Sequence, residues 1–375
     1  MSAFTSEERQ LLDDSLQDYI RSKYTFEHFR ELTAADEVDG FGRAEWSEYA
    51  ELGWLGTSLP ESADGAGGGL TELCIVMAAC GRGLLLEPFL STIVMGAGAI
   101  EKVGTGEQQK ILSEVAVGKR LLAFAHVEPD AGYARDYVRT VARPEGEGFV
   151  LDGEKGFTLH AQSADTLIVS ARVGGDAGPV ALFLVPANAE GVHFRPGPAF
   201  DGRRGAEISL SGVKVGGDAK LGASDADQTE VISGLIDRGV IAASAEAVGA
   251  MTTVAEMTLE YLKSREQFGQ PLAKFQVLQH RIVEMNLACE EARVLVHAAL
   301  EAVDTGSPVA QRMVWNAKVQ TAKSARLVGG QAIQLHGGMG MTDELAIGHY
   351  YKRLTMCETM YGDGDWYLSQ ITAKG

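Results

Sequence analysis

The sequence predicts a mainly helical protein with a β domain in its middle: an N-terminal helical domain at residues 1–120, a β domain at 121–222 and a helical bundle at 223–375. Three observations predict this fold class. Apolar residues keep a helical spacing near the start, β-branched runs begin near residue 121, and long apolar helical segments fill the remainder. We expect a small antiparallel sheet, a barrel or a sandwich, in the middle.

The first domain is predicted from a helix-start signal and from helix breakers. Thr5 and Glu8 have the spacing of a capping box, and the apolar residues after them follow a helical period. The stretch from Gly53 to Leu70 contains Pro60 and a run of glycines. These residues disfavour a helix and a central strand, so we expect a loop there.

The middle domain is predicted from seven short runs that are β-branched or alternate in polarity. In chain order they are LLAFAHV, YVRTVAR, GFVLDGEKGFTL, DTLIVSAR, VALFLVPA, VHFRP and AEISLSGVKV. Turn signals such as DG, GG and GP separate them. We expect each run to be a strand.

The last domain is predicted from four long helical segments with short links, which is the pattern of an antiparallel bundle. The segments are 224–264, 275–303, one from Ser307-Pro308 to Gly337-Gly338, and one after Asp343. The first is apolar on most faces and should be largely buried. Ser307-Pro308 suits a helix start, and the two glycines suit a helix end.

The charge balance and the lengths of the apolar runs argue against two classes of partner. The chain has 51 acidic and 33 basic residues, a net charge of −18. Nucleic-acid binding needs a basic footprint, so a nucleic-acid partner is not expected. The sequence also predicts no membrane insertion, because no apolar run approaches the length of a bilayer span.

The cysteine pattern indicates a reducing compartment. The four cysteines (Cys74, Cys80, Cys289 and Cys357) have neither CxxC spacing nor the density of a disulfide scaffold. We interpret them as buried thiols, expect no metal site, and expect a cytoplasmic protein because the acidic, amphipathic start is unlike a signal peptide.

Two segments in the bundle could bind a ligand. In SREQFGQPLAKFQ, a helix ends near Gly269 and Pro271 forces a turn, which would present Arg265, Phe268 and free amides to a pyrophosphate and a flat ring. A plain helix–helix corner explains this segment equally well. In QAIQLHGGMGMTDELAIGHYYKR, two glycines end a helix beside Gln334, and an ordinary helix stop is the alternative.

Together these segments resemble the acyl-CoA dehydrogenase family. Its signature runs approximately R-x-x-F-G-x-x-[hydrophobic]-x-x-x-Q, then Q-x-x-G-G-x-G about 60 residues later; here these are REQFGQPLAKFQ and QLHGGMG. In the middle domain AFAHVEPDAG is similar to the family's T-E-P-x-x-G-S-D loop. The AFAH loop, the GHYYKRLTM stretch and the YGDGD end further resemble the small subunit of pimeloyl-CoA dehydrogenases.

The resemblance implies FAD as cofactor, with its two ends held by different subunits. For the ADP end it implies Arg265, Phe268, Leu272, Gln334, Gly337 and Gly338. For the flavin ring it implies His126, Val127, Phe157 and Leu159. Val127, Tyr133 and Leu159 stand where relatives have hydroxyl residues, each of which would give a hydrogen bond of roughly 1 kcal/mol.

The resemblance also implies a carboxylate that removes the α-proton of an acyl-CoA while the flavin accepts the β-hydride. Gly362 stands where most relatives have this glutamate, with Asp363 one residue away. A branch similar to isovaleryl-CoA dehydrogenases has its base where Asp237 stands here, which makes Asp237 the candidate catalytic residue. The alternative for Asp237 is an aspartate that faces a solvent gap or pairs with a lysine. Arg238 and Tyr133 are the candidate substrate-binding residues.

Four functional hypotheses follow. The first is an active α,β-dehydrogenase of lipid metabolism or β-oxidation, a dimer of dimers that passes electrons to a flavoprotein. The second is a supporting subunit of an α2β2 heterotetramer with a larger paralogous subunit. The third is a flavin oxidase or monooxygenase on the same scaffold. The fourth, a non-flavin interaction protein, would require every matching cradle residue to be coincidental.

Overall fold

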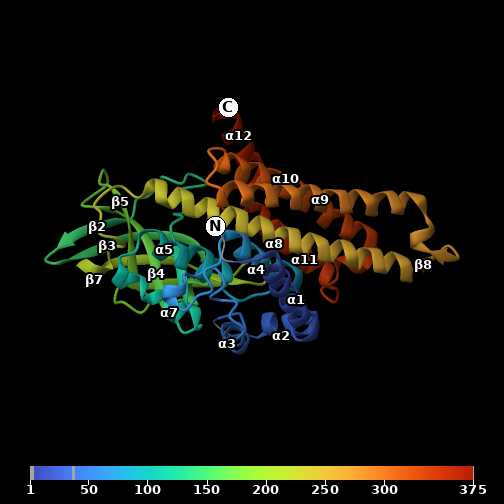
Figure 1. Ribbon diagram of the computed structural model, residues 1–375, viewed down its shortest axis with the longest axis horizontal. Coiled ribbons are helices and arrows are strands. Elements are labelled where there is room, and N and C mark those ends of the chain that lie inside the picture. Colours follow the sequence, from blue (N-terminus) through green and yellow to red (C-terminus); the bar gives the residue numbers. More distant parts are fainter. Residues whose placement is uncertain (1–3, 36–38, 375) are drawn as a thin grey trace. The chain divides into compact units, whose positions relative to one another are not determined.

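The computed structural model describes residues 4–35 and 39–374 and divides into two compact units (Figure 1). The helical unit combines Met1–Glu31, Leu70–Leu85 and Val240–Gly375. The sheet unit combines Leu32–Gly69 and Leu86–Gly239. Each unit has its own core, so each is described separately.

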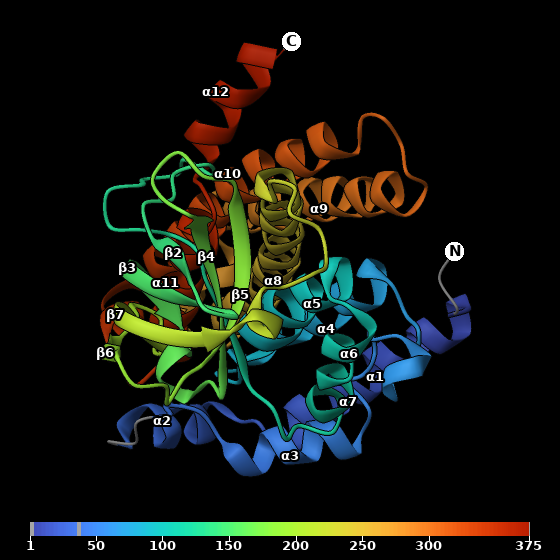
Figure 2. The ribbon, with the colours of Figure 1, turned by 90° about the vertical axis from the view of Figure 1, so that its left-hand side faces the viewer.

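The sheet unit is built on a seven-stranded sheet with strand order β1-β4-β2-β3-β7-β6, and β5 also pairs with β4. The strands are β1 (Leu122–Ala125), β2 (Val141–Glu145), β3 (Gly148–Leu159), β4 (Thr166–Val173), β5 (Val180–Pro186), β6 (Val192–Pro198) and β7 (Arg204–Gly216). All seven predicted runs therefore form strands. Figure 2 shows β2, β3 and β4 side by side.

The sheet is mixed, which corrects the expectation of a purely antiparallel one. β1 and β2 both pair with β4 in parallel, whereas β2–β3, β3–β7, β4–β5 and β6–β7 are antiparallel. Inward side chains such as Leu151, Val169 and Phe183 form its buried apolar core. Parallel strands need long connections, and the segment between β2 and β4 (residues 146–165), which contains β3, provides one of them.

Short helices complete the sheet unit. They are α3 (Arg43–Glu51), α5 (Gly98–Val103), α6 (Gly106–Gln109) and α7 (Ile111–Ala116), with 3₁₀ turns at Glu61–Ala63, Ala161–Ser163 and Gly217–Ala219. A π-helix, η2 (Phe89–Ala97), is wholly buried and packs against β1. Thr92 fixes that contact, because its hydroxyl donates to the Leu122 carbonyl (3.0 Å) and accepts from the Leu122 amide (3.1 Å).

The helical unit contains the long helices. They are α1 (Ser6–Ser22), α4 (Leu70–Gly83), α9 (Gln276–Asp304), α10 (Ala310–His336), α11 (Ala346–Thr359) and α12 (Gly364–Lys374), together with α8 (Thr229–Ser264) from Val240 onward. The Thr5–Glu8 capping box is present at α1. Helix α10 packs against α9, α11 and α12. No helix among the described residues has the length and apolarity needed to cross a bilayer.

A fully buried ion pair ties three segments of the helical unit together. Arg353 on α11 donates to Glu246 on α8 (2.9 Å) and to the carbonyl of Leu85, which follows α4 (3.0 Å). Both charged side chains are at most 1% exposed. Removing one partner would leave a buried charge, so this pair specifies how the three segments meet.

Candidate functional site

In the helical unit, the structure brings the two sequence motifs of the bundle together. The rings of Tyr261, near the end of α8, and His336, at the end of α10, stack with centroids 4.3 Å apart and planes 24° apart. Arg265 follows Tyr261 by one helical turn, and Gly337-Gly338 follow His336 directly. Burial lowers the pKa of His336, so its ring is neutral and acts as packing between the motifs.

Phe268 lies at the tip of a two-residue hairpin between β8 (Glu266–Gln267) and β9 (Gln270–Pro271). Its side chain is 90% exposed and its φ is +55°, and Gly269 has φ +79°. Positive φ at both positions is the geometry of a tight hairpin, where asparagine and glycine are preferred over an aromatic residue. An exposed aromatic side chain on a strained backbone indicates a residue placed for contact with a ligand or another chain.

The rest of this cradle is open on its outer side. Gln334, Gly337 and Gly338 are exposed, and a Cβ added at either glycine would meet nothing within 4 Å. Gly337 has φ +61° and ψ −140°, a conformation available essentially to glycine alone. Leu272 holds the base of the hairpin through its amide, which donates to the Arg265 carbonyl (2.8 Å).

These residues fit the ADP end of FAD. The exposed Arg265 guanidinium suits a pyrophosphate, Phe268 offers a flat apolar face, and the two glycines leave room for close approach of a ligand to the backbone.

In the sheet unit, the flavin loop is defined here as residues 126–136, which overlap the predicted loop segment AFAHVEPDAG (123–132), and it starts from a buried ion pair. Lys155 on β3 donates to Glu128 (2.8 Å), and the same carboxylate accepts from the Thr140 hydroxyl (2.7 Å) and the Arg139 amide (2.7 Å). Burial lowers the pKa of Lys155 to about 8 despite its partner. Burial alone would raise the pKa of Glu128, but Lys155 and Thr140 lower it below its ordinary value.

His126 lies inside this network and does not face outward. Its Nδ1 is 2.9 Å from the Ser170 hydroxyl and its Nε2 is 3.1 Å from the Arg135 carbonyl. A carbonyl only accepts, so Nε2 carries the proton and Nδ1 accepts from Ser170. Burial, then the charge of Lys155, lowers the pKa of His126 to about 4. His126 therefore braces the loop as a neutral ring.

Apolar side chains form the outer face of the loop region. Val127, Tyr133 and Phe157 are all exposed, and Leu159 is partly exposed. The Phe157 ring lies over Gly205, where an added Cβ would come within 2.8 Å of it. The Val127 carbonyl accepts from the Gly156 amide (2.8 Å), which joins the loop to β3. This face suits a flat ring held by packing and backbone amides.

Asp237, the candidate base, forms an ion pair. Nη2 of Arg135 donates to its Oδ1 (2.8 Å), while Nη1 of Arg135 donates to the Ser233 hydroxyl (3.0 Å). The side chains of Arg135 and Asp237 are 11% and 13% exposed. Asp237 is thus paired with a cation, as one alternative anticipated, but the cation is an arginine and not the expected lysine.

Arg238, the candidate CoA contact, lies on the same helix. Its guanidinium is 3.7 Å from the Glu101 carboxylate, and its Nε would be 3.1 Å from a Cβ added at Gly98. Gly98 therefore gives this long side chain its space. The pair with Glu101 is long and partly exposed, so it competes weakly with an incoming anion.

In the helical unit, the other candidate carboxylate serves as a helix cap. Asp363 precedes α12, and its Oδ1 accepts from the Trp366 amide (2.8 Å). Gly362 has φ +114°, and an added Cβ would meet the Tyr367 ring at 2.8 Å. Buried Lys318 holds the approach to this turn by donating to the carbonyls of Cys357 (2.6 Å) and Met360 (3.0 Å).

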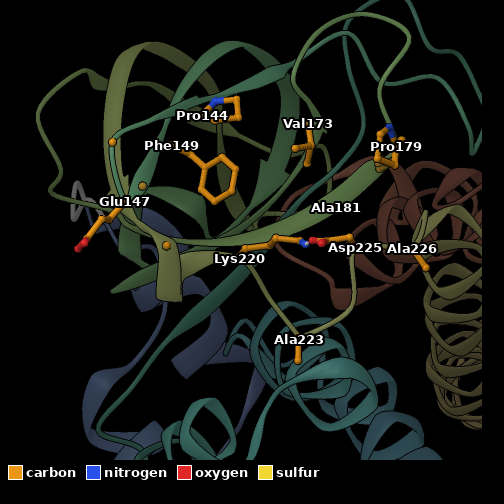
Figure 3. Close-up of a pocket in the computed structure, with 15 residues that line it drawn as sticks. Pro144, Glu147, Phe149, Val173, Pro179, Ala181, Lys220, Ala223, Asp225 and Ala226 are labelled. Carbon is orange, nitrogen blue, oxygen red and sulfur yellow. Dashed lines mark hydrogen bonds and ion pairs between the residues drawn. The ribbon is translucent and has the colours of Figure 1, made fainter.

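A separate pocket of about 630 Å³ lies in the sheet unit beside the β2–β3 turn (Figure 3). Phe149, Val173 and Ala181 give it an apolar wall, and an ion pair between Lys220 and Asp225 lies at its side. None of the predicted site residues lines it. It is therefore distinct from the flavin loop.

Sequence reasoning missed Arg135, Ser233 and Ser170 as parts of the site. Arg135 and Asp237 are 102 positions apart, so no local pattern could pair them. A signal was available in Asp237 itself, because a carboxylate in an apolar helix requires a partner. Arg135 lies three residues beyond the predicted loop segment AFAHVEPDAG, so the motif did not include it.

A β domain between helical domains, with an open cradle that would suit a dinucleotide and an apolar loop region that would suit a flat ring, is the arrangement expected of a flavin-dependent oxidoreductase. The chain belongs to the acyl-CoA dehydrogenase family. The N-terminal, middle and C-terminal domain models of acyl-CoA dehydrogenase match residues 6–119, 123–215 and 229–374. The predicted family, fold class and enzyme class are confirmed, and FAD is the cofactor of this family.

Named relatives agree with this assignment. Acyl-CoA dehydrogenase FadE12 of Mycobacterium tuberculosis is 31% identical, over 92% of this chain and 90% of the relative. The ChsE4-ChsE5 complex from Mycobacterium tuberculosis is 26% identical, with a TM-score of 0.89 over 100% of this chain and 98% of that chain. A variant of the Tcur3481-Tcur3483 steroid ACAD is 28% identical, with a TM-score of 0.88 over 98% and 97%.

Proposed function

We propose that this chain is the supporting subunit of an α2β2 acyl-CoA dehydrogenase, which helps to hold FAD while a larger paralogous subunit supplies the base. The observation that carries the proposal is the ion pair between Arg135 and Asp237. One oxygen of the candidate base already accepts a charged hydrogen bond. A proton-abstracting carboxylate works best where no cation competes for its lone pairs.

The remaining candidate positions support the same role. Asp363 caps α12, and Gly362 occupies a turn that a larger side chain would disturb. The ADP cradle, in contrast, is open and matches the family signature residue by residue. An intact cradle without an available base is the combination expected of a subunit that completes its partner's flavin site.

Structural relatives support a heteromeric assembly. The ChsE4-ChsE5 complex and the Tcur3481-Tcur3483 ACAD are each named for two different proteins. We infer an equivalent pairing here, acting on an acyl-CoA with electrons passed to a flavoprotein. The resemblance to pimeloyl-CoA dehydrogenase small subunits and the steroid ACAD relative favour a bulky or dicarboxylic acyl group.

The chain's own residues have defined tasks in this proposal. Bound FAD supplies the hydride acceptor. Arg265 and Gly337-Gly338 would bind its pyrophosphate end, the 126–136 loop and Phe157 would support a ring, and Arg238 would pair with an anionic group of CoA. The four cysteines are buried, and we infer that the protein works in the cytoplasm.

The test is an absorbance spectrum of the purified chain with added FAD, first alone and then co-purified with the larger subunit. We expect little flavin on the chain alone and stoichiometric flavin on the complex, bleached anaerobically by an acyl-CoA. Replacing Arg265→Met in this chain should release flavin from the complex, whereas Arg312→Met, an exposed arginine at the start of α10, should not.

Two outcomes would contradict the proposal. The first is a chain that retains about one FAD per subunit by itself and is bleached by an acyl-CoA, with Asp237→Asn blocking the bleaching; it would establish a self-sufficient dehydrogenase. The second is acyl-CoA-dependent oxygen consumption by the complex without an electron acceptor, which would identify an oxidase or monooxygenase.

A further inference from the structure

The flavin loop is anchored to the sheet at both of its ends. At the start, Glu128 is bound by Lys155 and Thr140. At the far end, Arg172 on β4 donates from Nε to the Val138 carbonyl (2.7 Å). These anchors lie ten residues apart in the chain. The turns between them, which carry Tyr133 and the exposed Gly132, need a further restraint if the loop is to present a fixed face.

The side chain of Arg135 provides a restraint toward a different element. It extends from the loop to α8 and binds Ser233 and Asp237, which are four residues apart and lie on one face of that helix. Its backbone carbonyl is bound by His126, which belongs to the sheet-side network. Arg135 therefore joins the loop to both the sheet and the helix.

The composition of the loop explains why such a restraint is needed. Val127 and Leu159 have no hydroxyl to offer a flavin ring, so the ring must be held by packing and by backbone amides. Backbone groups bind tightly only when they are held in place beforehand, because otherwise binding must also order the loop. A rigid loop can thus compensate for absent side-chain hydrogen bonds.

We propose that Asp237, through Arg135, is a positioning residue that holds the 126–136 loop in its flavin-binding conformation. This inference deepens the proposed function and rests on its placement of the FAD ring against the loop. It assigns Asp237 a role in cofactor binding in place of proton abstraction. Ser233 is the second acceptor of the same clamp, defined as Arg135, Ser233 and Asp237.

The first experiment measures amide hydrogen exchange of residues 126–136 in the free chain, which requires neither flavin nor partner. Asp237→Asn and Arg135→Met should each speed exchange roughly tenfold, and the double variant should be no faster than either single one, because both changes remove one charged contact. Arg135→Lys should restore part of the protection. Glu230→Gln, an exposed carboxylate on the same helix, is the matched control and should change nothing.

The second experiment measures the dissociation constant and visible spectrum of FAD in the heteromeric complex. The clamp variants should weaken FAD binding roughly tenfold and alter the flavin band, while at saturating FAD the rate of anaerobic flavin reduction should be retained. Unchanged exchange in both single variants would overturn the inference. So would an Asp237→Asn complex that binds FAD normally but is not reduced.

The two experiments separate this inference from the proposed function. If the chain proves to be a self-sufficient dehydrogenase, the exchange of the free chain still tests the clamp by itself. If the supporting role is right but the clamp is wrong, the complex forms and turns over while the loop exchanges at the same rate in every variant.

Discussion

At the scale of single residues, His126 shows how burial sets the state of a titratable group. Its ring accepts from Ser170 and donates to the Arg135 carbonyl, so both nitrogens are committed in the neutral form. Protonation would place a second donor against Ser170, and burial beside Lys155 disfavours the charge further. The neutral ring therefore stabilises the folded chain, and acid that protonates the ring should destabilise the fold.

The unfolding of the chain should depend on pH through this ring. The pKa of His126 is about 4 when folded, against an ordinary 6.5, so the unfolded chain binds the extra proton first. Stability is then complete above pH 6.5 and is lost as the pH falls toward 4, by on the order of 3 kcal/mol. Urea denaturation between these values should show a flatter profile for His126→Gln. Exposed His193→Gln should keep the parent slope, and an unchanged slope in His126→Gln would refute the argument.

At the scale of elements, the β8–β9 hairpin carries a conformational cost at its tip. Phe268 holds a positive φ that asparagine adopts far more readily, and its ring is almost fully exposed. No packing in the described part of the helical unit offsets this cost beyond an edge contact with Phe275, whose centroid is 6.1 Å away. An aromatic ring kept in such a position is consistent with contact to a cofactor.

Phe268→Asn should separate the stability of the hairpin from its function. Asparagine followed by Gly269 favours this turn, so amides in β8 and β9 should exchange roughly two- to fivefold more slowly, which corresponds to about 0.5–1 kcal/mol. FAD binding to the complex should weaken, because the flat ring is lost. Phe200→Asn, another exposed phenylalanine, is the control for FAD binding. A variant that binds FAD at least as well as the parent would contradict this role of Phe268.

At the scale of the whole chain, most elements could be predicted because they depend on local patterns. The seven strands and the four long helices follow from period, caps and breakers. Helix α12 was missed because Gly362 and Gly364 signal a turn, and Asp363 was not recognised as its cap. The parallel pairs of β4 were missed because strand partners are chosen by tertiary packing.

The residues of the site also divide into those that local motifs identify and those that depend on tertiary contacts. Cradle residues occur in short motifs that a family signature captures, so Arg265, Phe268 and Gln334 could be predicted as a group. The role of Asp237 depends on Arg135, 102 residues earlier, and no periodicity reports that contact. Residue types alone identified a carboxylate that needed a partner, and the fold identified the partner.

Global stability should depend on the ion pair between Arg353 and Glu246. Arg353→Met leaves the Glu246 carboxylate buried without its cation and frees the Leu85 carbonyl, so the free energy of unfolding should fall by roughly 3–5 kcal/mol. Arg293→Met breaks the exposed pair with Glu290 and should cost less than about 1 kcal/mol. Chemical denaturation measures both. Equal losses in the two variants would show that burial does not set the energy of these pairs.

The four buried thiols have a practical consequence for spectroscopy. Each is at most 6% exposed, and burial raises the pKa of Cys289 to about 12, so thiol reagents that attack the thiolate meet little reactive sulfur in the native chain. A cysteine introduced at the exposed Gln267 would then take up a maleimide dye selectively. A fluorophore at that hairpin would report cofactor arrival by energy transfer to the flavin, in real time and without turnover.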